Sequence, residues 1–131
     1  MAVYSLEDKV TALLEIANQR AGFELSLVCT DQGLLIALAG DSEAAEIVAG
    51  VTSLFSDMVQ RAVRDLSFTR LDEVTLLDPK RGRIVIRPVP GESSTTFFLV
   101  IRAKATVSWR KTTTELTANL VPLLSSFSEV R

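Results

Sequence analysis

Histidine is absent from the 131-residue sequence. This removes the commonest general base near neutral pH and the commonest transition-metal ligand. Cys29 is the only cysteine, which excludes an internal disulfide and a zinc site built from several cysteines. We therefore expect no bound metal and no cofactor, in a protein that suits a reducing compartment.

Motifs for nucleotide or acyl chemistry are also missing. Neither G-x-x-x-x-G-K-[ST] nor G-x-G-x-x-G occurs, so no loop is predicted to hold nucleotide phosphates. No G-x-S-x-G serine elbow occurs either. The adjacent carboxylates Glu7/Asp8 and Asp72/Glu73 would point apart on a helix or strand, so neither pair predicts acid–base catalysis. The expectation is a protein that is not an enzyme, without a catalytic centre of its own.

Long apolar runs are lacking as well. No stretch approaches the roughly 18 to 20 consecutive apolar residues that a membrane span requires. Residues 1–5 have neither the basic region nor the apolar run of a signal peptide. We therefore expect a cytoplasmic protein that does not insert into a membrane.

Charge is divided unevenly along the chain. Residues 1–78 carry 5 basic and 13 acidic side chains, net −8, whereas residues 79–131 carry 9 basic and 3 acidic side chains, net +6. The basic part could attract nucleic acid, but no aromatic side chains are interleaved with its charges for stacking on bases. We expect a solvated rim and no nucleic-acid partner for the following cations: Lys80, Arg81, Arg83, Arg87, Arg102, Lys104, Arg110 and Lys111.

Apolar periodicity predicts the order of the elements as α-β-β-α-β-β-β-α. Helical spacing begins at Leu6, with Ser5 and Asp8 resembling a capping box and Gly22 a stop. A second helix covers residues 41–66, and a third begins between residues 108 and 112, where Thr112 and Glu115 suggest another capping box. Pro122 should kink that helix or end it near Val121. Strand-like patterns separated by turn residues occupy residues 23–30, 34–39, 68–77, 83–88 and 96–103.

Short hairpin connections predict a mainly antiparallel sheet of these five strands. Residues 34–39 and 97–101 are apolar without alternation, so helices should cover both faces of the sheet, with residues 97–101 in a central strand. The predicted fold class is an α/β sandwich of the α+β type. One domain should span residues 1–131.

The helix of residues 41–66 has two distinct sides. Its apolar side chains span roughly 140°, wider than one face of a sheet would need. They are Ile47, Val48, Val51, Leu54, Phe55, Met58, Val59, Ala62 and Leu66, with Ala45 and Val63 beside them. A polar stripe lies opposite and should face solvent or a partner; it contains Glu46, Ser53, Asp57, Gln60, Arg61 and Arg64.

Two further residues carry interpretations of their own. Cys29 shares strand parity with Phe23, Leu25 and Leu27, which predicts a buried, unreactive thiol. Trp109 lies where a strand gives way to a helix. It is either a packing anchor or, if exposed, an interface hot spot.

The pattern as a whole resembles the roadblock (dynein light chain) family, whose fold is related to profilin-like folds. The resemblance rests on LSLVCTDQGLLIALAG, then a long helix, then GRIVIRPVPG and TTFFLVIRAKA, and covers about residues 6–127. It implies the long helix on one face of the sheet, the two terminal helices on the other, and a homodimer joined through third strands and second helices. The dimer residues on this chain would be Val51, Phe55, Val59, Val63, Val74, Thr75 and Leu76.

Two functions follow as expectations from this resemblance. The first is a dimeric regulator or scaffold of a small Ras-like GTPase, whose GTP hydrolysis it could stimulate. The residues expected to bind the GTPase are Ser53, Asp57, Gln60, Arg61 and Arg64. The second is a purely structural dimeric adaptor in a motor or signalling complex. A small-molecule sensor is a third reading, with no convergent polar set in the sequence to support it.

Overall fold

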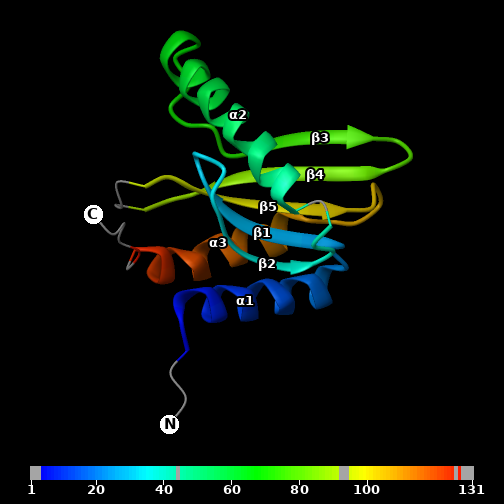
Figure 1. The fold of residues 1–131 in the computed structure, drawn as a ribbon. Coiled ribbons are helices and arrows are strands. Elements are labelled where there is room, and N and C mark those ends of the chain that lie inside the picture. The colour runs from blue at the N-terminus through cyan, green and yellow to red at the C-terminus, as the bar shows by residue number, and fades with distance from the viewer. Residues whose placement is uncertain (1–3, 44, 92–94, 126, 128–131) are drawn as a thin grey trace.

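The computed structural model describes residues 4–43, 45–91, 95–125 and 127, so residues 1–3 of the expected N-terminal segment lie outside it (Figure 1). The elements follow the predicted order, as an antiparallel five-stranded sheet and three helices. Their bounds are α1 Leu6–Ala21, β1 Leu25–Thr30, β2 Leu35–Gly40, α2 Ala45–Asp65, β3 Val74–Asp78, β4 Gly82–Val89, β5 Phe97–Ala103 and α3 Arg110–Leu124. Within the described ranges, no helix is long and apolar enough to cross a bilayer.

The helix α1 begins and ends as its sequence predicts. The backbone N–H of Asp8 donates to Ser5 Oγ at 3.1 Å, and the backbone N–H of Ser5 donates to Asp8 Oδ2 at 3.2 Å. Gly22 ends the helix with φ of 76°, a conformation that glycine adopts without a steric penalty. α1 packs beside α3 on one face of the sheet, where Val10, Leu14 and Leu120 are fully buried.

The strands lie in the order β2-β1-β5-β4-β3, which places the apolar strand β5 at the centre as predicted. Its side chains alternate between the two cores: Leu99 and Ile101 face α1 and α3, and Phe98 and Val100 face α2. β2 is an edge strand, yet both α1 and α2 contact it, which explains why its sequence is apolar on both sides. β3 forms the other edge and, among the residues that the structure describes, pairs with β4 alone.

The start of one strand and two expectations for α3 need correction, although α3 begins within the predicted range of residues 108–112. β3 begins at Val74 and not at residue 68, after an irregular segment in which Ser67 has a positive φ of 59°. α3 has Trp109 as its N-cap with no side-chain cap, so the capping box expected at Thr112 is absent. The same helix continues through Pro122 to Leu124 and does not end near Val121.

The expected solvated rim of cations also needs correction at Arg87. Its side chain is only 11% exposed. Nη1 donates to Thr113 Oγ1 at 2.9 Å and to Thr114 Oγ1 at 2.8 Å, while Nη2 pairs with Asp72 Oδ2 at 3.3 Å. Arg87 therefore joins β4 to α3 and to the segment that precedes β3.

Candidate interaction surface

The helix α2 packs on the sheet through small side chains. Its buried residues are Ala45, Ala49, Thr52 and Ser56, which recur at helical spacing along one side. Thr52 satisfies its buried hydroxyl by donating to the carbonyl of Val48 at 2.7 Å. The sheet-facing side of α2 therefore takes in only one edge of the broad apolar arc, where Ala45 is buried and Val48 and Phe55 are half-buried against the same core. Small residues let the helix lie close to β1 and β2.

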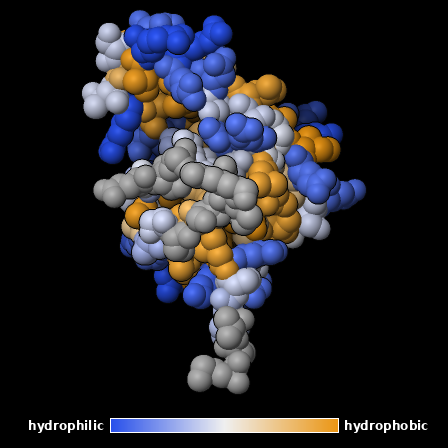
Figure 2. Space-filling model, turned by 60° about the vertical axis from the view of Figure 1, so that its left-hand side comes forward, coloured by the Kyte–Doolittle hydropathy of each residue, from blue (hydrophilic) through white to orange (hydrophobic). Residues whose placement is uncertain are grey.

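Several large apolar side chains of α2 point into solvent instead. Ile47 is 70% exposed, Leu54 72% and Met58 57%, and exposed Val51 completes a stripe at i, i+4, i+7 and i+11. With 3.6 residues per turn, this apolar stripe lies on the side of the helix opposite Ala49 and Ser56. The C-terminal half of α2 projects past the sheet (Figure 1), and hydrophobic surface shows among hydrophilic atoms over this region (Figure 2).

The residues expected at a dimer interface lie in two groups. Val51 and Val63 are exposed on α2, whereas Phe55 and Val59 are half-buried between the apolar stripe and the sheet. On β3, Val74 and Thr75 are half-buried and Leu76 is exposed. Because β3 pairs only with β4, its outer edge has no strand beside it among the described residues. An exposed edge strand of this kind is a template for pairing with another chain.

The predicted polar stripe of α2 forms a third side of the helix. Asp57 Oδ2 and Arg61 Nε pair at 3.2 Å, with both side chains largely exposed. Arg64 Nε pairs with its neighbour Asp65 at 3.0 Å, and Gln60 is exposed between these pairs. Ser53 is half-buried and donates to the carbonyl of Gly50 at 2.6 Å. The five residues thus share a face, and four of them present polar groups to solvent.

Sequence reasoning missed that Ile47, Leu54 and Met58 point outward. They were placed in the apolar arc, but periodicity alone does not say which side of a helix meets the sheet. The sequence does contain a pattern that indicates the sheet-facing side. Small residues repeat at helical spacing on the side of the helix opposite the exposed apolar residues; they are Ala45, Ala49, Thr52 and Ser56. Two parallel stripes, one small and one large, indicate a helix with two packing partners.

Trp109 is a packing anchor in the described structure. Its Nε1 donates to Glu73 Oε1 at 2.8 Å. The Arg83 guanidinium lies 4.1 Å from the ring centroid and that of Arg110 lies 5.0 Å away, within the range of cation–π attraction. Glu73 directly precedes β3, so this cluster fixes the start of the edge strand against α3.

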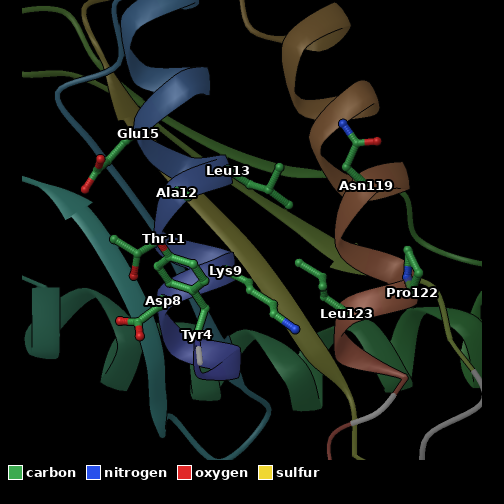
Figure 3. Close-up of a pocket in the computed structure, with 10 residues that line it drawn as sticks. All are labelled: Tyr4, Asp8, Lys9, Thr11, Ala12, Leu13, Glu15, Asn119, Pro122 and Leu123. Carbon is green, nitrogen blue, oxygen red and sulfur yellow. The ribbon is translucent and has the colours of Figure 1, made fainter. Parts of the chain in front are cut away.

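A groove of about 1080 Å³ runs along the outer face between α1 and α3 (Figure 3). Leu13 and Leu123 extend between the two helices, whereas the carboxylates of Asp8 and Glu15 point away from α3. Asp8 is also committed to the helix cap. The polar groups of this groove do not converge on one point, so its geometry gives the sensor reading no support.

Cys29 is fully buried, as predicted, beside Leu25 and Leu27 under α2, although Phe23 lies in the other core. Burial raises the pKa of the thiol to about 12, and a hydrogen bond with Thr52 opposes the shift.

We expect a thiol reagent at pH 8 to label native Cys29 at least about a hundredfold more slowly than the unfolded chain, because the thiolate is the reactive form. Absorbance of the released thiol product measures both rates. Equal rates would show that the strand is not packed in this register.

The similarity of this chain to known proteins is found in its three-dimensional structure. No protein-family model matches the sequence, and no curated protein matches it. MglB from Myxococcus xanthus superposes with a TM-score of 0.80 at 15% identity, covering 99% of this chain and 98% of that chain. The gliding protein MglB from Thermus thermophilus has a TM-score of 0.77 at 14% identity, covering 94% and 93%. A Roadblock/LC7 domain from Streptomyces avermitilis has a TM-score of 0.72 at 16% identity, covering 88% and 98%.

The chain has the roadblock fold. The match extends over nearly the whole chain and includes both α2 and the edge strand β3. The roadblock fold thus accounts for the position of the terminal helices α1 and α3 on one face and α2 on the other.

Proposed function

We propose that this chain is a dimeric protein-binding module that regulates or scaffolds a small Ras-like GTPase in the cytoplasm. The observation that carries the proposal is the outward apolar stripe of α2, Ile47, Val51, Leu54 and Met58, near an edge strand with no neighbour among the described residues. A large exposed apolar patch with polar residues at its side is typical of a protein–protein interface. The choice of a small GTPase as the partner rests on the resemblance to the roadblock family.

In the proposed dimer, two copies of α2 bury their apolar stripes against each other. Leu54 and Met58 then join Val51, Phe55, Val59 and Val63 at the interface. The two β3 strands pair through Val74, Thr75 and Leu76, which would supply hydrogen-bond partners along the free edge. This arrangement removes from water the apolar groups that α2 leaves exposed in a single chain.

The polar stripe of α2 is the proposed GTPase-binding site. Two such helices side by side would present Asp57, Gln60, Arg61 and Arg64 from each copy on one rigid surface. The chain has no histidine and no phosphate-binding loop, so stimulated hydrolysis would come from repositioning the loops of the GTPase. Neither Arg61 nor Arg64 is assigned as a catalytic residue.

Affinity capture from the source cell tests this function. The purified chain is immobilised and offered lysate containing excess GDP or a non-hydrolysable GTP analogue. We expect a small GTPase to be retained in a nucleotide-dependent manner. A set of retained proteins that does not change with nucleotide would contradict the GTPase proposal and indicate the structural adaptor instead.

Truncating three residues of the polar stripe should strongly weaken this binding without unfolding the protein. We expect the triple variant Asp57→Ala, Gln60→Ala and Arg64→Ala to bind the captured GTPase at least about tenfold more weakly. The melting temperature should stay nearly constant, because the exposed pair of Asp57 and Arg61 contributes only about 0.2 to 0.5 kcal/mol. Isothermal titration calorimetry and thermal melts measure the two effects.

The matched control places the same kinds of substitution on α1, at Glu15→Ala, Gln19→Ala and Arg20→Ala. These side chains are exposed on the opposite side of the sheet. The control should bind the GTPase as the parent chain does. Unchanged binding by the α2 variant would show that the site is elsewhere.

A further inference from the structure

A second charged feature lies at the end of the sheet where β3 turns into β4, at the right of Figure 1. A cleft of about 530 Å³ opens here. Lys80 and Arg81 come from the turn, Arg102 from β5 and Lys104 from the loop that follows it. Four cations from two separate segments of the chain therefore share one cleft.

Strand register brings these cations together. Asp78 pairs with Gly82 across the hairpin, and Ile84 pairs with Arg102 of β5. Gly82 has φ of 97°, and a Cβ there would overlap the carbonyl oxygen of Ala103. The turn can lie directly against the end of β5 only because this residue has no side chain.

The positive charge of the cleft is only partly compensated. Among the described residues, none of the four cations forms an ion pair. Asp78 Oδ1 accepts hydrogen bonds from the backbone N–H groups of Lys80 at 2.8 Å and Arg81 at 3.0 Å, which hold its carboxylate in the turn. These bonds, and to a smaller extent the charge of Arg81, lower the pKa of Asp78, so this carboxylate offsets part of the charge of Arg81. Glu24 is the carboxylate that lines the cleft itself. An anionic ligand would relieve the repulsion that remains.

We propose that this cleft binds an acidic peptide segment of a partner protein. Arginine and lysine side chains from the turn and from the end of β5 suit carboxylates spaced along an extended chain. No aromatic side chain lines the cleft in the part of the chain that the structure describes, so a nucleic acid would lack a stacking platform. A flat membrane would not reach half-buried Arg102 in a concave site. The inference does not depend on a GTPase or on dimer formation, since β5 and the turn belong to one chain.

Fluorescence anisotropy with a fluorescein-labelled oligoglutamate peptide tests the proposal. We expect saturable binding that weakens as salt rises from about 50 to about 200 mM, because exposed charges are screened. Lys80→Gln with Lys104→Gln should weaken binding at least about tenfold, and Arg102→Gln should do the same. Lys80 and Lys104 are exposed, so their double variant should keep the parent circular dichroism spectrum.

The control variant, Lys9→Gln with Arg20→Gln, makes the same change in net charge on α1. It should bind the peptide like the parent chain. Equal weakening in both double variants would overturn the proposal, because it would reflect net charge alone. The absence of saturable binding at low salt would also overturn it. So would tighter binding of single-stranded RNA, inorganic phosphate or phosphatidylserine vesicles that depends on the same lysines.

Discussion

Leu54→Glu combined with Met58→Glu should convert a dimer into a monomer of about 14.3 kDa. Both side chains are largely exposed in the single chain, so the glutamates should not disturb its fold. In the proposed dimer they would place carboxylates in an apolar contact, where unpaired charge costs several kcal/mol. We expect the dimer dissociation constant to rise by at least about a hundredfold. Light scattering coupled to size exclusion measures the mass at micromolar concentration.

A control for charge lies on the same helix. Gln60→Glu with Arg64→Gln changes the net charge by the same amount on the polar stripe, and this variant should stay dimeric. A monomeric parent chain would contradict the proposed dimer. If the parent is dimeric and the Leu54 and Met58 variant remains so, the copies associate through another surface, and the apolar stripe is free for a different protein.

Gly40→Ala should destabilise the fold by about 2 to 4 kcal/mol. Gly40 ends β2 with φ of 98°, and a Cβ there would overlap the carbonyl oxygen of Glu24. That oxygen accepts the backbone N–H of Asp41 at 3.0 Å, so the strand end must shift and this hydrogen bond must weaken. Chemical denaturation followed by circular dichroism measures the free energy of unfolding.

The same substitution in α2 should have the opposite sign. Gly50 is helical and exposed, and a Cβ there would meet nothing within 4 Å. Gly50→Ala should therefore stabilise the chain by about 0.5 to 1 kcal/mol, since alanine loses less backbone entropy in a helix. A Gly40 variant as stable as the parent would show that the end of β2 does not have this conformation.

Local patterns were sufficient to predict the element order and the central strand. A run such as Phe97–Ile101, apolar on both sides, is stable only between two covered faces, and β5 has that position. The N-cap of α1 depends only on Ser5 and Asp8, which are close in sequence, and its C-terminal end depends on Gly22; both ends formed as predicted. Such features are decided by neighbours along the chain.

Features that depend on distant residues were not predictable in this way. Glu73 and Trp109 are 36 positions apart, and their hydrogen bond fixes where β3 can begin. Burial of Arg87 likewise requires hydroxyls of Thr113 and Thr114, which the sheet and α3 bring together. The wide apolar arc predicted a second packing surface on α2, but not which residues would form it, because only the folded structure shows that alanine and threonine make the close approach to the sheet.

The burial of Cys29 makes this protein suitable for site-specific labelling with spectroscopic probes. Its only thiol is fully buried and has a pKa of about 12, so a reagent added to the native protein should leave it unmodified. A single cysteine introduced at Thr75 or Asp57 would then take a spin label or fluorophore alone, with no need to replace the native residue. Distances between labels on two copies could map the association of subunits directly in solution.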